Sequence, residues 1–283
     1  MKKHFPKILS IVWLQGEDNI PNNIFKENLR NWKLLNPSWV VNLIDEHGLK
    51  KICKDYSNDC LKVYESFDLM HLKIDFARYV LLYNTCTMYV DMDCYALRSL
   101  DGSQEFSTLI NRYINKDVDN IIGLSTVNIN PFESYMFIGQ NKTINNAIMI
   151  SSPKNPVIKS LIDTIINKNL NKKENIEKSD YSRIQKTTGP ILVNKFFRNF
   201  IKNPTCNCYI ELFPHYIFEP AEPFGHCDIR DSTIAIHKFE MSWISDNFKN
   251  LLEFYFKIKP ALIVIPIVLV IYLLNSSKRK NGR

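Results

Sequence analysis

Two acidic triplets supply paired carboxylates, which are groups that could hold a divalent cation. They are Asp91-x-Asp93 and Asp117-x-Asp119. The first triplet directly follows the apolar segment 87–90, which we predict to be a strand, and side chains at i and i+2 of extended backbone share one face. Open α/β sheets bind ligands at the carboxyl ends of their strands. The second triplet precedes a predicted strand in a polar run, so we interpret it as a solvated loop.

The chemistry that such a pair of carboxylates supports is the binding of a hard cation by oxygen ligands. A cation held in this way can bind a diphosphate and stabilise the charge that grows on it as it leaves a substrate. A chain with this aspartate content contains about one D-x-D triplet by chance, so the triplet alone is weak evidence and its context decides.

A second pair of opposite charges lies upstream, on a helix that we predict over 71–84. Asp75 and Arg78 are at i and i+3, hence on one face of that helix. A purely structural surface ion pair, worth under about 1 kcal/mol, is the other interpretation. Because this pair is followed so closely by Asp91 and Asp93, we interpret the four side chains as one site.

The elements that must position these residues follow from the apolar periodicity of the chain. Apolar segments predict strands at 7–13, 39–44, 87–90, 121–125, 147–150 and 233–236, and helical spacing predicts helices at 22–35, 71–84, 155–166 and 190–201. Two short helices are expected within 46–68. Strands that alternate with helices indicate an α/β fold with much parallel pairing.

Composition excludes several classes of protein. The net charge is +7, but four positive charges lie within the last six residues, and no basic stripe is interleaved with aromatic residues, so we expect no nucleic-acid partner. The seven cysteines are odd in number and irregularly spaced, which favours free thiols over a disulfide or zinc scaffold.

The C-terminus differs from the rest of the chain. Residues 261–274 are fourteen uncharged residues, fewer than the 18 or so of a typical spanning helix, but lysines flank them on both sides. We predict a catalytic domain at 1–250, a juxtamembrane segment at 251–259, a single-pass transmembrane helix at 260–275 and a basic tail at 276–283, with the catalytic domain facing the cytosol. The alternative is a buried core helix.

The ordered set of motifs resembles glycosyltransferase family 32, the family of DXD sugar-binding transferases, over about residues 5–243. The motifs are Phe5-Pro-Lys-Ile-Leu…Trp13, Trp32…Asn36-Pro37-x-Trp39, Asp75-x-x-Arg78-Tyr79-x-x-Leu82-Tyr83, Tyr89-Val-Asp91-Met-Asp93, Asn146-Ala-Ile-Met-x-x-x-Pro153-x-x-Pro156, Thr188-Gly-Pro190 and His237-x4-Ser242-Trp243. That family includes inositol phosphorylceramide mannosyltransferases and the initiating α-1,6-mannosyltransferases of yeast.

The resemblance implies a single GT-A domain with a Rossmann-like nucleotide-binding half, followed here by the C-terminal apolar helix. It further implies a Mn²⁺ or Mg²⁺ cofactor and transfer with retention of anomeric configuration. The implied donor is a nucleotide-sugar such as GDP-mannose or a UDP-hexose, and the implied acceptor is a glycolipid or another glycan.

The resemblance also assigns roles around the cation. Asp93 would bind the metal, and Asp91 would bridge metal and ribose. His237 would be a further metal or phosphate contact, whereas its sequence alone equally fits a buried structural histidine. Ser242 and Trp243 would close over the diphosphate, since an indole N–H is a donor suited to an anionic oxygen.

The remaining roles concern the sugar and the base of the donor. Asp75 and Arg78 would hold sugar hydroxyls, because a carboxylate accepts and a guanidinium donates hydrogen bonds in a fixed geometry. Asn146 would line the sugar pocket, and Trp13 would lie near the base.

The chain departs from the family where Cys86-Thr87 replaces the usual Gly-Gly before the predicted strand 87–90. Glycine there allows a tight turn. One alternative to an active enzyme is therefore a catalytically impaired, membrane-anchored relative that only binds a sugar or nucleotide. A second, unrelated alternative is a nucleic-acid binder that uses the basic tail.

Overall fold

The computed structural model describes residues 3–21, 24–127, 143–171, 180–222 and 227–238, together with positions 254 and 258. The chain divides into two compact units, Met1–Pro223 with Cys227–Glu240, and Phe224–His226 with Met241–Arg283. The description that follows concerns the first unit.

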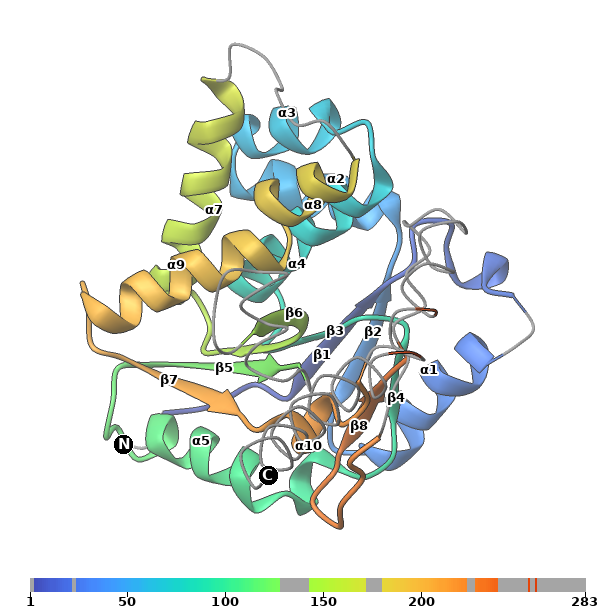
Figure 1. Ribbon diagram of the computed structural model, residues 1–283. Coiled ribbons are helices and arrows are strands. Elements are labelled where there is room, and N and C mark those ends of the chain that lie inside the picture. Colours follow the sequence, from blue (N-terminus) through green and yellow to red (C-terminus); the bar gives the residue numbers. More distant parts are fainter. Residues whose placement is uncertain are drawn as a thin grey trace, which may run out of the picture. The chain divides into compact units, whose positions relative to one another are not determined.

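A six-stranded sheet in the order β2-β1-β3-β6-β5-β7 forms the centre of this unit (Figure 1). Its strands are β1 Ile8–Val12, β2 Val40–Ile44, β3 Met88–Val90, β5 Asn120–Thr126, β6 Ile144–Ser151 and β7 Cys208–Phe213. The pairs β1–β2, β1–β3 and β5–β7 are parallel, whereas β6 is antiparallel to both of its neighbours, β3 and β5. This parallel-rich α/β sheet agrees with the GT-A-like fold that the sequence motifs imply.

Helices cover both faces of the sheet. Figure 1 shows α2, α3, α4, α7 and α8 gathered on one side and α1, α5 and α10 on the other. The bounds are η1 Glu17–Asn19, α1 Ile24–Leu35, α2 Glu46–Tyr56, α3 Asn58–Ser66, α4 Met70–Asn84, η2 Leu100–Gly102, α5 Gln104–Ile114, α7 Pro156–Leu170, α8 Asp180–Thr187, α9 Pro190–Lys202 and α10 His215–Phe218. Asp45, Ser57, Ser103 and Asn155 cap α2, α3, α5 and α7 with side-chain oxygens, as expected for N-cap residues.

A separate two-stranded ribbon begins three residues after the carboxyl end of β3, with Asp91, Met92 and Asp93 between them. It pairs β4, Cys94–Ala96, with β8, Ala235–His237, in antiparallel register with Cys94 opposite His237. We predicted the strand near 233–236 but not its partner β4. The three residues of β4 are too few to carry a recognisable alternation, and their pairing comes from the distant end of the chain.

Cys86 and Thr87, the residues that replace Gly-Gly, fit the fold without strain. Both are buried, and neither is among the non-glycine residues with positive φ in the described part of the chain. Thr87 donates its N–H to the carbonyl of Ile8 at 3.0 Å and its hydroxyl to the carbonyl of Pro6 at 2.5 Å. These bonds tie the start of β3 to β1, so the strand that leads to Asp91 is firmly placed.

The described helices contradict the prediction of a single-pass membrane anchor, and with it the predicted location of the protein. None of them is long and apolar enough to cross a membrane. The longest two, α4 and α7, have 15 residues each, whereas a spanning helix takes about 20. The segments 251–259, 260–275 and 276–283 lie outside the described residues, apart from positions 254 and 258.

Candidate functional site

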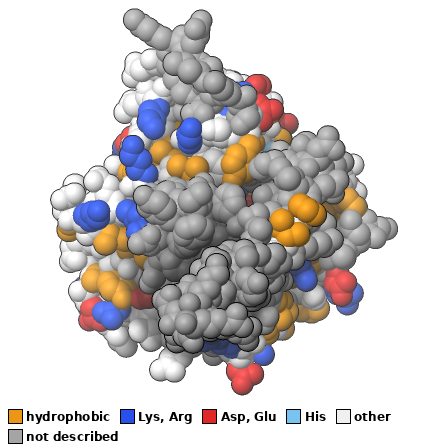
Figure 2. Space-filling view, in the orientation of Figure 1, with side chains coloured by type: hydrophobic (Ala, Val, Ile, Leu, Met, Phe, Trp, Pro, Cys, Tyr) orange, Lys and Arg blue, Asp and Glu red, His pale blue; other side chains and the backbone are white. Residues whose placement is uncertain are grey.

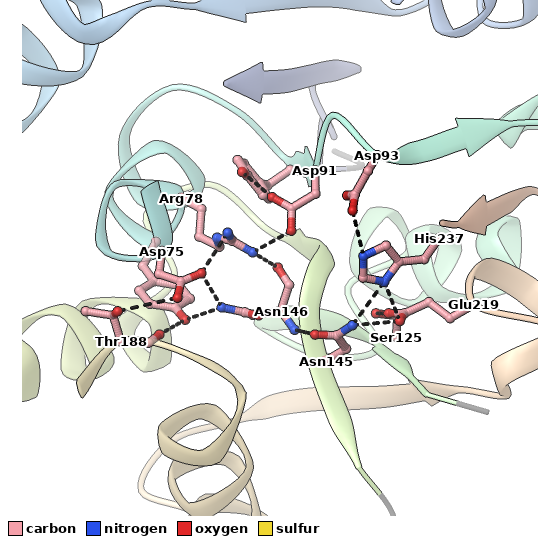
Figure 3. A network of polar contacts seen from close by, with 12 residues as sticks. Asp75, Arg78, Asp91, Asp93, Ser125, Asn145, Asn146, Thr188, Glu219 and His237 are labelled. Atoms are coloured by element: carbon pink, nitrogen blue, oxygen red, sulfur yellow. Dashed lines mark hydrogen bonds and ion pairs between the residues drawn. The ribbon is translucent and has the colours of Figure 1, made fainter. Parts of the chain in front are cut away.

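The site lies at the edge of the sheet where β3 ends and β6 begins (Figure 3). Because β6 is antiparallel to β3, its first residues lie beside the residues that follow β3. The N–H of Asp91 donates to the carbonyl of Ala147 at 2.8 Å, which fixes this neighbourhood. Asp91 and Asp93 therefore share a neighbourhood with Asn145 and Asn146, which are distant in sequence: Arg78 contacts both Asp91 and Asn146, and His237 contacts both Asp93 and Asn145.

Arg78 joins the helix α4 to both strands. Its Nη2 lies 2.7 Å from Asp75 Oδ1, and its Nη1 lies 3.0 Å from Asp91 Oδ2 and 2.7 Å from the carbonyl oxygen of Asn146. The guanidinium also packs on the ring of Tyr89, 4.7 Å from its centroid. The structure thus brings together Asp75, Arg78 and Asp91 as the sequence predicts, with Arg78 as the bridge.

The carboxylate of Asp75 is held from three directions. Besides Arg78, Asn146 donates its Nδ2 to Asp75 Oδ1 at 3.0 Å, and the Thr188 hydroxyl donates to Asp75 Oδ2 at 3.4 Å. Asn146 Nδ2 also donates to the hydroxyl of Tyr79 at 3.0 Å. Sequence reasoning assigned no role to Thr188 or Tyr79, although both belong to the motifs that carry the family resemblance.

Burial controls the charges of this cluster. It raises the pKa of Asp75, against the opposing effect of Arg78 and the hydrogen bonds from Asn146 and Thr188. Burial, together with the neighbouring Asp93, raises the pKa of Asp91 to about 6 despite Arg78. The side chains of Asp91 and Asp93 keep 23% and 19% of their surface exposed, while Asp75 and Arg78 are buried. The two carboxylates of the D-x-D triplet are therefore the accessible members of the set.

The β4–β8 ribbon creates a second cluster beside the first. Asp93 Oδ2 lies 3.4 Å from His237 Nε2, and the N–H of Lys238 donates to the carbonyl of Asp93 at 3.0 Å. The ligand atoms of Asp93, Cys94 and His237 lie within 4.8 Å of one another. These residues could hold a metal ion, and the prediction that Asp93 and His237 share one place agrees with their geometry.

The chemistry of these donors fits a hard or borderline divalent cation. Burial and the nearby carboxylates of Asp93 and Asp91 raise the pKa of the Cys94 thiol well above its usual value, so it stays protonated and is a poor ligand. One carboxylate oxygen and one imidazole nitrogen remain. Such a set suits Mn²⁺ or Mg²⁺, whose other coordination positions are filled by substrate phosphates and water.

Behind His237 lies a group of polar residues that sequence reasoning missed. His237 Nδ1 is 3.0 Å from Glu219 Oε2, and Glu219 also accepts hydrogen bonds from Asn145 Nδ2 at 2.6 Å and from the hydroxyl of Ser125. Burial alone lowers the pKa of His237, but Asp93 and Glu219 outweigh it and raise that pKa well above its usual value. The only sequence signal for Glu219 is an acid placed in the otherwise apolar stretch 217–220.

Three predicted residues are not part of either cluster as described. Trp13 follows β1, and its ring packs on Phe25 with 5.5 Å between centroids, while its indole Nε1 is buried and has no hydrogen-bond partner among the described residues. Ser242 and Trp243 lie outside the described residues. Asp119 forms a surface ion pair with Lys3, 3.7 Å apart, so the triplet at 117–119 is a solvated loop, as predicted.

A cavity of about 490 Å³ lies elsewhere, between α2, α3 and α7. Its lining includes Tyr56, Tyr83, Lys154, Lys159 and Asp163 and contains none of the residues of the two clusters. We place the functional site at the clusters because they combine buried charges, accessible carboxylates and cation ligands, whereas the lysines that line the cavity, Lys154 and Lys159, are exposed.

Comparison with known proteins identifies the class. Residues 22–114 match the family described as the glycosyltransferase sugar-binding region containing a DXD motif, a span that includes Asp75, Arg78, Asp91 and Asp93. An uncharacterized glycosyltransferase, L373, of Acanthamoeba polyphaga mimivirus is 24% identical over 203 residues, which cover 71% of this chain and 68% of that protein.

Two solved structures are also similar. The PaToxG glycosyltransferase has a TM-score of 0.45 and 14% identity, covering 71% of this chain and 70% of that one. The catalytic domain of alpha-toxin from Clostridium novyi has a TM-score of 0.36 and 11% identity, covering 72% of this chain and 65% of that one.

The protein is a glycosyltransferase. More particularly, on the family match and the viral relative, it is a DXD-type glycosyltransferase similar to family 32.

Proposed function

We propose that this glycosyltransferase is metal-dependent and moves a hexose from a nucleotide-sugar to a glycan or glycolipid acceptor with retention of configuration. The observation that carries the proposal is that Asp91 and Asp93, from the turn between β3 and β4, converge with His237, from β8, beside the buried Arg78 cluster. Retention and the hexose follow from the resemblance to family 32, which includes mannosyltransferases.

Asp93 and His237 are the residues that would hold Mn²⁺ or Mg²⁺. When bound, the cation would neutralise the diphosphate and stabilise it as the leaving group. Asp91 contributes differently, because Arg78 contacts one of its oxygens at 3.0 Å and the Tyr89 hydroxyl donates to the other at 2.7 Å. With both oxygens already engaged, Asp91 suits contact with the ribose or with a metal-bound water.

Asp75, Arg78 and Asn146 would form the floor of the sugar pocket. Arg78 holds Asp75 and Asp91 at fixed positions, and a carboxylate has lone pairs left to accept from sugar hydroxyls. Their preorganisation by hydrogen bonds means that little reordering is needed when a donor binds. Trp13 would contact the base, and Ser242 and Trp243 would contact the diphosphate.

The alternative is a catalytically impaired relative that binds a sugar or nucleotide without transfer. This alternative was based on Cys86-Thr87 in place of Gly-Gly. Both residues are buried and neither has a positive φ, and β3 pairs in register with β1 and β6. We therefore favour the active enzyme.

Donor hydrolysis by the full chain tests the proposal. UDP-glucose, UDP-galactose, UDP-N-acetylglucosamine and GDP-mannose are each incubated with Mn²⁺, and the nucleotide released is measured. We expect one donor to be hydrolysed by the wild type and not by Asp93→Asn, with Asp119→Asn as the matched control because Asp119 lies in the solvated loop. Equal release by Asp93→Asn and wild type, or no release from any donor, would overturn the proposal of a metal-dependent transferase.

A further inference from the structure

Glu219 is a fully buried acid, with 0% of its surface exposed. A buried carboxylate is costly unless hydrogen bonds compensate it. Glu219 has three partners: the Ser125 hydroxyl donates to Oε1, Asn145 Nδ2 donates to Oε2 at 2.6 Å, and His237 Nδ1 lies 3.0 Å from Oε2 (Figure 3). Both carboxylate oxygens are therefore engaged inside the protein, on the far side of His237 from Asp93.

The orientation of Asn145 decides where the proton of His237 lies. The Oδ1 of Asn145 accepts from the N–H of Asn146 at 2.8 Å, so its NH₂ group must face Glu219. Asn145 Nδ2 also lies 3.3 Å from His237 Nδ1, but its shorter contact is the one of 2.6 Å with Glu219 Oε2. A carboxylate oxygen accepts hydrogen bonds, so we assign a proton to His237 Nδ1, which donates to Glu219 at 3.0 Å.

We propose that Glu219 is a positioning residue that fixes the ring orientation and tautomer of His237. A bound divalent cation would displace the proton that Nε2 shares with Asp93 Oδ2, 3.4 Å away, whereas the proton on Nδ1 would stay with Glu219 and leave Nε2 as the ligand atom. A histidine ligand that donates its other nitrogen to a carboxylate is better oriented and more basic. The inference rests on the proposed function, because it assigns Glu219 to the same metal site.

A purely structural role is the competing explanation for Glu219. It would make Glu219 important for folding but would leave cation binding by His237 and Asp93 unchanged in any variant that folds. Glu219→Gln separates the two roles, because the side chain keeps its size and can still accept from His237 Nδ1 through its amide oxygen, but it loses the negative charge. Without an anionic acceptor at Nδ1 the imidazole is less basic, so Nε2 becomes a weaker ligand.

The experiment measures Mn²⁺ affinity of the full chain by calorimetry, in wild type, Asp93→Asn, His237→Ala, Glu219→Gln and the double variant of His237 and Glu219. We expect Glu219→Gln to weaken Mn²⁺ binding about 10- to 100-fold. In the His237→Ala background the same change should add little, because Glu219 acts through His237. Glu211→Gln is the matched control, since Glu211 is a partly buried acid of β7 that accepts from Tyr209 at 2.7 Å, and its affinity should equal that of wild type.

The outcomes are distinguishable. Suppose that wild type binds Mn²⁺ and that both Asp93→Asn and His237→Ala weaken this binding. If Glu219→Gln then leaves the affinity unchanged, or weakens it as much in the His237→Ala background as in wild type, the positioning role is refuted and the metal site stands. If wild type binds no Mn²⁺, or if Asp93→Asn and His237→Ala bind as wild type does, the proposed metal site fails and this inference with it. A readout that does not depend on any variant's folding is ¹⁵N NMR of His237 in the Mg²⁺-loaded wild type. We expect the proton on Nδ1, and a proton on Nε2 would overturn the inference.

Discussion

Replacing Arg78 with methionine tests whether the buried cluster depends on one cation. Arg78 makes polar contacts of 2.7, 3.0 and 2.7 Å with Asp75, Asp91 and the carbonyl of Asn146. Methionine fills a similar space but leaves the buried carboxylate of Asp75 without a cation and Asp91 with only the Tyr89 hydroxyl. Breaking a buried pair in this way costs about 3–5 kcal/mol, a large share of a typical domain's 5–15 kcal/mol.

The assay for Arg78→Met is urea unfolding followed by circular dichroism, compared with Lys7→Met. Lys7 pairs with Asp101 at 2.9 Å on the surface, so its loss should change the free energy of unfolding by about 1 kcal/mol or less. Adding Asp75→Asn to Arg78→Met should recover about 1–3 kcal/mol, because one of the uncompensated charges is then removed. A cost for Arg78→Met no larger than that for Lys7→Met, or no recovery in the double variant, would refute the reasoning.

Three further predictions follow from other features. Burial, and to a smaller extent Arg78, lowers the pKa of His71 to about 4, so the unfolded chain binds a proton at this position before the folded chain does as the pH falls. The free energy of unfolding should therefore drop by up to about 3 kcal/mol between pH 6.5 and 4. In His71→Asn this part of the pH dependence should be missing. Gly189→Ala places a Cβ 3.0 Å from the carbonyl of Ile184 and 3.3 Å from Asp75 Oδ2. This crowding should lower stability by about 1–3 kcal/mol in thermal unfolding and raise the KM for the donor. Gly102→Ala is the control, because the space around Gly102 is open and neither stability nor KM should change. Chelation by EDTA should stop donor hydrolysis and added Mn²⁺ should restore it; hydrolysis that persists in EDTA would contradict a metal-dependent reaction.

The local parts of the site were predictable from sequence because each rests on a short-range pattern. The helix predicted at 71–84 is α4, Met70–Asn84, and the strand predicted at 87–90 contains β3, Met88–Val90. The i, i+3 spacing of Asp75 and Arg78 placed them on one face, and the carboxyl end of the strand placed Asp91 at the ligand-binding edge. The structure adds that Arg78 links the two carboxylates directly.

The parts that could not be predicted depend on pairing between distant segments. Asp93 and His237 meet only because β4 pairs with β8, and Glu219 reaches His237 from the residue after α10. No local periodicity encodes such contacts. The membrane prediction failed for a related reason: an apolar composition is compatible with several environments, and none of the helices described has the length to span a bilayer.

Strand β6 joins the two halves of the site through the adjacent residues Asn145 and Asn146. Successive side chains of a strand point to opposite sides. Asn145 accordingly donates to Glu219 on the side of the proposed metal site, while Asn146 donates to Asp75 on the side of the proposed sugar pocket and offers its carbonyl to Arg78. A shift of β6 by one residue against β3 would exchange these side chains and leave both buried carboxylates short of a donor. The register of Met88 with Ile150 and of Val90 with Ile148 thus fixes the proposed cation ligands and the proposed sugar-binding residues together.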